Sequence, residues 1–374
     1  MLCRMGFMLP LFSRRALLLS SLLAGATLTP VGAAFAQAEG IAPLSEGPEL
    51  YPGEKTLAEA AAKEGVTISA NTALGWANWG AVVRAFGQRY PDVPLAYTDL
   101  GSTATVTQLD RLRERPPADA AYFYSLVALD AASRGLLAPH RPVNLDRLPG
   151  AAKDPDGLWV GVHTLPIAFV VNRKLVKSLP RTWADLRKPE FKTSITYPDP
   201  QTTTVGLTLA FAANVAAGGT LDSVRPGIEY FTALHKAGNV QRIDPGSAQA
   251  RFLRGEIPVW ITFEADGLRV KHLDGMDEAE VILPADGTAA AAYTLSLVKG
   301  ARNAAGGKLW VNFALTETAQ RLFAEGFVRP ILPNFSLPPE LAARFAPLPP
   351  RTDLVDSLRA TLRKADIDRA WPKM

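Results

Sequence analysis

The chain has 374 residues, a formal net charge of +4 at pH 7 and a single cysteine, Cys3. This length is sufficient for two domains that each bury an apolar core. The small charge gives no electrostatic argument for nucleic acid or an anionic membrane as a partner, and one cysteine cannot form an intramolecular disulfide.

Residues 1–36 have the layout of a cleaved export signal. Three basic residues precede an apolar run at 16–26: Arg4, Arg14 and Arg15. Small residues at 34–36 form an Ala-x-Ala cleavage site. Residues 13–18 (SRRALL) resemble the twin-arginine signal, so Sec and twin-arginine export both stay open. The alternative is a membrane anchor, for which the apolar run is short. We therefore expect an exported, periplasmic protein that is soluble after cleavage, lacks cysteine and carries a charge of about +1.

The first half of the remaining chain alternates strand-like and helix-like segments. The predicted strands are 66–70, 93–98 and 120–124. The predicted helices are 79–89, 105–115 and 126–134. Residues 159–172 form the longest β-rich run, which is too long for one ordinary strand. This alternation favours the α/β class, with mostly parallel sheets covered by helices on both faces.

A second α/β alternation follows this run. The predicted strands are 194–197, 257–263, 280–283 and 293–298. The predicted helices are 203–217, 228–237 and 304–325, and a last helix at 353–364 comes after a proline-rich stretch. The sequence has no internal repeat and no second membrane-spanning run.

Four segments, taken in order, resemble a known family. They are Ala77-Asn78-Trp79-Gly80 with Phe86-x-x-x-Tyr90-Pro91; Ile167-Ala168-Phe169-Val170-Val171-Asn172-Arg173-Lys174-Leu175 with Pro180-Arg181-Thr182-Trp183-Ala184-Asp185-Leu186; Arg254-Gly255-Glu256-Ile257-Pro258-Val259; and Val298-Lys299-Gly300-Ala301-Arg302-Asn303 with Phe313-Ala314-Leu315-Thr316-x-x-x-Gln320. With these segments the chain resembles the extracellular solute-binding proteins of bacterial ABC importers, family 1, in the group that holds the iron(III), polyamine and maltose receptors.

The resemblance implies a two-lobed periplasmic-binding-protein type II fold whose lobes are joined by crossing hinge strands and enclose the solute. The crossings are expected near 163–167, 286–293 and 329–332. Lobe 1 would comprise 37–163 and 287–330, and lobe 2 would comprise 164–286 and 331–374. The partners implied are a small-molecule solute and an inner-membrane ABC permease. We expect a monomer, with no cofactor, no metal and no nucleic acid.

Ligands of open α/β sheets bind beyond the carboxyl ends of the strands, which selects the candidate site residues. The candidates that follow predicted strands or lie at the first crossing are Trp76, Trp79, Ser102, Thr103, Tyr124, Ser125, His163, Gln201, Thr202, Thr203, Thr204 and Glu264. Trp76 and Trp79 are three residues apart, so on a helix they would share a face. Core packing is the alternative for Trp79, and a histidine satisfied by the backbone is the alternative for His163.

The hydroxyl-rich helix starts at 102–105 and 201–204 indicate the ligand chemistry. A helix N-terminus offers free N–H groups and a partial positive charge, which suit a phosphonate or carboxylate. Helix capping explains one hydroxyl at each start, but not three in a row. An ammonium end would face Glu264 and the tryptophans. The sequence therefore predicts an anionic or zwitterionic solute.

Other ligands and other classes of protein stay open as alternatives. A polyamine or another organic cation could be held by the acidic and aromatic residues alone. Ferric iron is disfavoured, because residues 241–263 lack the tyrosine pair that iron receptors of this family use. The common hydrolase, nucleotide-binding and calcium motifs are absent, so we expect no enzyme. An exported hydrolase on the same fold is the alternative from a different class.

Overall fold

The computed structural model describes residues 41–70, 73–241 and 247–372. The predicted export signal and its cleavage site lie outside these residues. Residues Ala38–Met374 cluster into one compact unit. Among the described residues, no helix is both long and apolar enough to cross a bilayer.

The first lobe contains a sheet in which three short strands are parallel. The strand order is β2-β1-β3-β9-β5, with β2 and β3 both parallel to β1. The bounds are Val66–Ala70 for β1, Leu95–Asp99 for β2, Ala120–Tyr124 for β3, Leu137–Ala138 for β4, Val160–Asn172 for β5 and Thr288–Val298 for β9. The helices of this lobe are α1 (Glu54–Ala61), α2 (Trp79–Arg89), α3 (Ser102–Arg111), α4 (Ser125–Ser133), α9 (Ala304–Ala314) and α10 (Glu317–Glu325).

The second lobe is built around the other half of β5. Strand β7 pairs antiparallel with β5 and parallel with β6, and β8 pairs antiparallel with β5. The bounds are Ile195–Thr196 for β6, Val259–Phe263 for β7 and Ala279–Ile282 for β8. The helices are α5 (Thr204–Ala216), α6 (Arg225–Lys236), α7 (Ala248–Leu253), α8 (Glu264–His272) and, near the C-terminus, α11 (Pro339–Ala342) and α12 (Ser357–Ala370).

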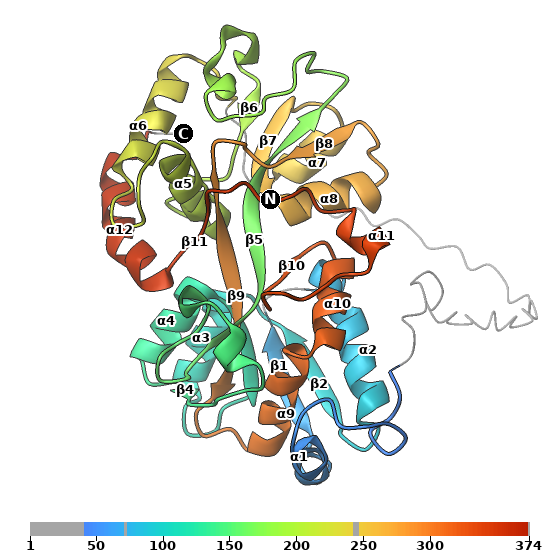
Figure 1. The fold of residues 1–374 in the computed structure, drawn as a ribbon. Helices are drawn as coiled ribbons and strands as arrows, with labels where there is room; N and C mark the ends of the chain where they lie inside the picture. The colour runs from blue at the N-terminus through green and yellow to red at the C-terminus, as the bar shows by residue number, and fades with distance from the viewer. Residues whose placement is uncertain (1–40, 71–72, 242–246, 373–374) are drawn as a thin grey trace, which may run out of the picture. The chain divides into compact units, whose positions relative to one another are not determined.

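Two long strands and one short strand connect the lobes (Figure 1). Strand β5 pairs with β9 from Val160 to Pro166 and with β7 from Ile167 to Val171. The N-terminal end of β9 pairs with β11 (Thr352–Leu354), and β10 (Arg329–Pro330) pairs with β5. The parallel pairing predicted from the sequence therefore holds within each lobe, whereas the crossing strands add the antiparallel pairs.

Several elements differ from the sequence-based prediction. Residues 160–172 form one strand, because its two halves pair with different partners. The predicted helix at 304–325 is two helices, since Thr316 caps α10 by accepting a hydrogen bond from the Ala319 N–H at 3.3 Å. Helix α8 (Glu264–His272) was not predicted. The last helix begins at Ser357 instead of the predicted residue 353. Asp356 caps it, since its side chain accepts a hydrogen bond from the Arg359 N–H at 2.9 Å.

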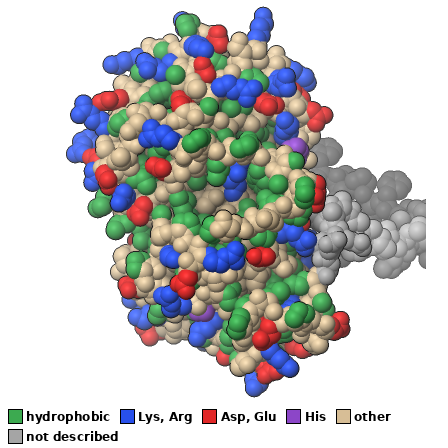
Figure 2. Space-filling model, viewed as in Figure 1, with side chains coloured by type: hydrophobic (Ala, Val, Ile, Leu, Met, Phe, Trp, Pro, Cys, Tyr) green, Lys and Arg blue, Asp and Glu red, His purple; other side chains and the backbone are tan. Residues whose placement is uncertain are grey.

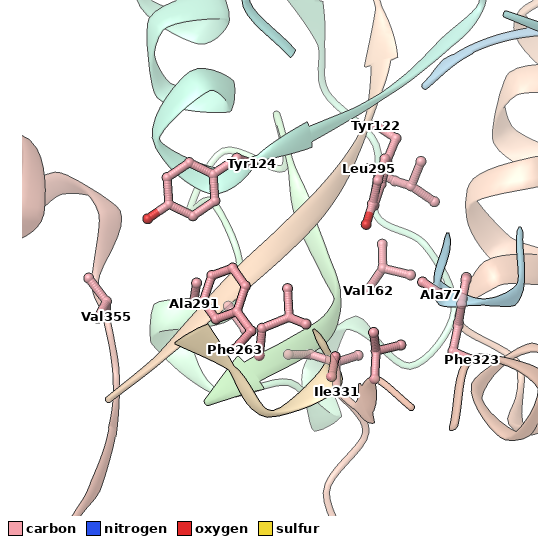
Figure 3. Packing of buried hydrophobic residues seen from close by; sticks show 14 of the residues in the cluster. Ala77, Tyr122, Tyr124, Val162, Phe263, Ala291, Leu295, Phe323, Ile331 and Val355 are labelled. Carbon is pink, nitrogen blue, oxygen red and sulfur yellow. The ribbon is translucent and has the colours of Figure 1, made fainter. Parts of the chain in front are cut away.

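The core around the crossing strands is apolar and aromatic. Tyr122 of β3, Val162 of β5 and Leu295 of β9 pack there and are fully buried (Figure 3). On the surface, positive and negative side chains are interspersed over the visible face (Figure 2), as the small net charge leads one to expect. The core thus fixes β3 and β5, which carry the candidate site residues Tyr124 and His163.

Candidate functional site

Three helices that begin with predicted site residues lie near one another, and two of them are joined by a hydrogen bond. The Tyr124 backbone N–H, at the start of α4, donates to Ser102 Oγ, at the start of α3, over 3.2 Å. Burial raises the pKa of Tyr124, and the neighbouring Thr208 side chain of α5 opposes that rise. Thr208 Oγ1 in turn donates to the carbonyl of Thr204, the first residue of α5, at 2.9 Å. Because α3 and α4 belong to the first lobe and α5 to the second, the neighbouring Tyr124 and Thr208 place helix starts from both lobes near each other.

Capping differs between the two hydroxyl-rich starts. Thr203 is the N-cap of α5: its Oγ1 accepts from Gly206 N–H at 3.0 Å and donates to the Asp199 carbonyl at 2.8 Å. The N-cap of α3 is Gly101, which has no side chain, so no side-chain cap is made there. The first N–H groups of α3 therefore keep their partial positive charge for another acceptor.

The remaining hydroxyl and amide candidates lie around these starts. Thr103 and Thr202 are exposed, whereas Ser125 at the start of α4 is 3% exposed. The exposed Gln201 is tied to α12, since its Nε2 donates to the Asp368 carbonyl at 2.8 Å. The structure therefore presents Thr202 and Thr103 to solvent, while Gln201 holds the C-terminal helix.

The two tryptophans do not share a helix face. Trp79 begins α2 and is fully buried against Tyr122, Trp310 and Phe323, with ring centroids 4.8 to 5.7 Å away. Trp76 lies in the preceding 3-10 turn, and the non-helical Ala77 separates the two. Trp79 is thus packed in the core, as the alternative interpretation had it.

Trp76 is half-buried and lies over aromatic rings of the crossing strands. Its ring centroid is 5.6 Å from His163 on β5 and 5.4 Å from Tyr293 on β9. Tyr124 is also in contact with Tyr293, at 5.7 Å. Tyr293 was not among the predicted site residues, although its position in a predicted crossing was a usable signal. The half-buried Trp76 and Tyr293 can offer an aromatic wall to a ligand.

His163 is fully buried below this wall. Its Nε2 is 2.6 Å from the Tyr122 hydroxyl, while Nδ1 has no hydrogen-bond partner within the part of the chain that the structure describes. Burial lowers the pKa of His163 to about 3, so the ring is neutral at pH 7. The partner of His163 is therefore a tyrosine side chain rather than the backbone.

Glu264 is buried and already paired with a cation. It begins α8, is 1% exposed and accepts two hydrogen bonds from Arg329 of β10, at 2.6 and 2.7 Å. The Arg329 guanidinium also lies over the Phe345 ring, 5.1 Å from its centroid. Burial raises the pKa of Glu264, and Arg329 acts in the opposite direction. An ammonium group near Glu264 would have to share this carboxylate with Arg329, which was not among the predicted site residues although it lies in a predicted crossing.

Among the described residues, no three His, Cys, Asp or Glu side chains come close enough together to hold a metal ion. The ligating chemistry of the described site therefore comes from helix starts, hydroxyls, aromatic rings and one ion pair.

Comparison with known proteins identifies the family. Residues 118–349 match the family model described as bacterial extracellular solute-binding protein. The chain belongs to this family. An uncharacterised protein of Haemophilus influenzae is 27% identical over 259 residues, which cover 64% of this chain and 70% of the relative. A Salmonella typhimurium protein with the provisional description 2-aminoethylphosphonate-binding periplasmic protein is 26% identical over 242 residues, covering 62% and 68%.

Solved structures share the fold of this solute-binding protein. The periplasmic binding protein AfuA from Actinobacillus pleuropneumoniae, with fructose-6-phosphate bound, has a TM-score of 0.65 and 23% identity, over 82% of this chain and 98% of AfuA. A ferric binding protein from Campylobacter jejuni has a TM-score of 0.66 and 16% identity, over 82% and 98%. The family and the two-lobed α/β fold predicted from the sequence are confirmed, and both neighbours are binding proteins. The predicted lobe boundaries and ligand-binding residues stay predictions.

Proposed function

We propose that this solute-binding protein is a periplasmic receptor of an ABC importer for a small anionic or zwitterionic solute. The solute carries a phosphonate- or carboxylate-like group, is enclosed between the two lobes and is delivered to an inner-membrane permease. The protein acts as a monomer without a cofactor.

The starts of α3, α4 and α5 carry this proposal, because Ser102 is bonded to the start of α4 and Tyr124 lies next to Thr208 of α5. Each helix N-terminus contributes a partial positive charge, and three that lie close together favour an anion more than one alone. The α3 start has no side-chain cap, so its N–H groups are available to oxygen atoms of a ligand. Ser102 and Thr204 place hydroxyl groups at two of the starts, which suits the several acceptor oxygens of a phosphonate.

The relatives support an acid group in the ligand. One is described as binding 2-aminoethylphosphonate, and another was solved with fructose-6-phosphate. Both compounds combine a phosphorus-containing acid with a small organic part. For a zwitterion, the aromatic wall of Trp76 and Tyr293 would receive the ammonium end by cation–π attraction, and Glu264 would share its charge between that end and Arg329.

A polyamine or another organic cation is the second candidate. The wall of Trp76 and Tyr293 and the carboxylate of Glu264 favour it. A cationic ligand would leave the helix starts without an anionic partner, however. The ion pair with Arg329 also reduces the negative charge that Glu264 can offer to a cation. Iron is disfavoured by the absence of tyrosine between residues 241 and 263.

Thermal unfolding of the mature protein with four matched compounds tests the proposal. 2-Aminoethylphosphonate has both charges, ethylphosphonate has the acid alone, ethylamine has the amine alone, and putrescine is a polyamine. A true ligand at about 100 times its Kd adds about 2.7 kcal/mol to the free energy of unfolding. We expect stabilisation by the two phosphonates and none by ethylamine. Stabilisation by putrescine alone would favour the cation receptor, and hydrolysis of a phosphonate by the pure protein would favour an enzyme.

A double variant tests the anion site. Thr202→Val with Thr204→Val removes two hydroxyls and leaves Thr203 to cap α5, so the helix content is expected to stay unchanged. Phosphonate binding should weaken at least tenfold, because a hydrogen bond to a charged acceptor is worth about 1.5–3 kcal/mol. Thr203→Ser, which keeps the capping hydroxyl, is the matched control. Unchanged phosphonate affinity in the double variant would contradict this site.

A further inference from the structure

The turn that carries Trp76 has an unusual backbone. Ala77 and Asn78 are consecutive residues with left-handed dihedral angles, at φ 50° and φ 60°. This region is unfavourable for residues with a Cβ atom, and a buried alanine there is uncommon. Such strain persists only where the surrounding structure imposes it. We refer to residues 75–78 as the Trp76 turn.

The C-terminal part of α10 imposes this conformation. Asn78 Nδ2 donates to the Leu322 carbonyl at 2.9 Å. The backbone of Gly326 lies so close that a Cβ atom there would be 2.4 Å from the carbonyl carbon of Ala77. The Trp76 turn is therefore held firmly against the first lobe, and its carbonyl groups have fixed positions.

A side chain of the second lobe bonds to this turn. Arg269 of α8 donates from Nη1 to the Gly75 carbonyl at 3.1 Å, and Gly75 directly precedes Trp76. Arg269 lies on the same helix as Glu264, whose carboxylate bonds to Arg329. A bond from a charged donor to a carbonyl in a fixed turn forms only when α8 is at this distance from the first lobe.

We infer that Arg269 is a positioning residue for solute capture, which fastens the second lobe to the Trp76 turn once the lobes have closed. This inference rests on the proposed capture of a solute between the lobes. The helix starts and the aromatic wall recognise the solute, whereas Arg269 determines how long the closed form lasts. Loss of Arg269 therefore accelerates solute release more than it slows solute binding.

Distances between spin labels test this role without knowledge of the natural solute. The only cysteine of the chain is Cys3, within the predicted export signal, so two new cysteines can be labelled in the mature protein. Glu59→Cys in α1 and Lys236→Cys in α6 place the labels at exposed sites on helices of different lobes. The distance distribution is measured without ligand and with excess 2-aminoethylphosphonate.

We expect Arg269→Met to move the distribution toward longer distances in at least one condition, and Arg269→Lys to restore it in part. Lys271→Met is the matched control, because Lys271 is on the same helix but pairs with Glu280 of its own lobe at 3.4 Å. Distributions that are the same in Arg269→Met and the unsubstituted protein, in both conditions, would overturn the inference.

Rates of binding give an independent readout. With 2-aminoethylphosphonate as the probe, Arg269→Met should raise the dissociation rate about threefold to tenfold, as loss of one solvent-exposed hydrogen bond predicts. The association rate should change less than about twofold. An affinity loss that comes from the association rate would also overturn the inference. If neither the unsubstituted protein nor any variant binds 2-aminoethylphosphonate, the proposed ligand class is wrong. The distances between the spin labels without ligand then still decide the role of Arg269.

Discussion

Removal of Arg329 should destabilise the protein in a pH-dependent way. Arg329 makes two hydrogen bonds to Glu264, a carboxylate that is 1% exposed. The variant Arg329→Met keeps much of the side-chain volume but leaves Glu264 without its cation. Breaking a buried ion pair from one side costs about 3–5 kcal/mol, because a charge is left without compensation. Protonation of Glu264 removes that charge, so the cost depends on pH.

The direction of this dependence follows from the pKa of Glu264. Burial already raises this pKa above its ordinary value and Arg329 opposes the rise. Without Arg329 the folded-state pKa of Glu264 increases further, while the unfolded-state value stays at about 4.3. A carboxyl group whose pKa is higher in the folded state loses stability as the pH rises from the unfolded value to the folded value, by about 1.4 kcal/mol per pH unit. The variant should therefore be close to the unsubstituted protein at pH 5 and about 3 kcal/mol less stable at pH 8.

Thermal unfolding at pH 5, 6.5 and 8 measures this difference. For a domain of about 340 residues the entropy of unfolding is about 0.7 kcal/mol/K, so 3 kcal/mol corresponds to a Tm decrease of about 4 °C. The control is Arg225→Met, which removes an ion pair with Glu229 whose side chains are 83% and 61% exposed, and it should cost less than about 0.5 kcal/mol. Adding Glu264→Gln to Arg329→Met should abolish the pH dependence. An equal Tm decrease at all three pH values would refute the reasoning.

Three further predictions concern single side chains. Thr203→Ala removes the α5 cap and should lower the free energy of unfolding in urea by about 1 kcal/mol, whereas Thr203→Ser should be nearly neutral. Burial keeps His163 neutral in the folded protein, with a pKa of about 3. The free energy of unfolding should therefore fall as the pH drops below about 6.5, by up to about 1.4 kcal/mol per pH unit. His163→Phe should make this fall shallower in urea titrations at pH 4 to 7. Gly326→Ala would bring a methyl group against the Ala77 carbonyl and should cost about 1–3 kcal/mol, while Gly87→Ala, on a helix with open space around it, should stabilise by about 0.5–1 kcal/mol in the same assay.

Short buried strands and their helices could be predicted well from the sequence. The strands Val66–Ala70 and Ala120–Tyr124 and the helix Trp79–Arg89 have the predicted bounds. Their apolar patterns are local, so no distant partner is needed to recognise them. The break between α9 and α10 was missed, because both helices continue one apolar pattern and only the cap at Thr316 separates them.

The site was harder to predict, because its contacts join distant parts of the chain. Arg329 and Arg269 matter through residues that are far away in the chain, among them Glu264 and the Gly75 carbonyl, and no local pattern indicates such pairs. The spacing of Trp76 and Trp79 suggested a common helix face, but the left-handed residues between them direct the two rings to different places. Positive φ at a buried alanine is set by packing and leaves no mark in the sequence.

The way in which β5 is shared has a consequence for the motion between the lobes. One continuous strand exchanges ladder hydrogen bonds with β9 up to Pro166 and with β7 from Ile167 onward. The lobes therefore cannot move apart as if they were joined by a flexible linker. Strand β5 is hydrogen-bonded in both lobes, so it must twist when the lobes separate. The proline at the changeover has no N–H to donate, so one ladder hydrogen bond is missing there, while its ring fixes its own φ angle. Angular movement should therefore be taken up by the residues on either side of Pro166, and its extent should be limited by how much twist the β5–β9 ladder tolerates.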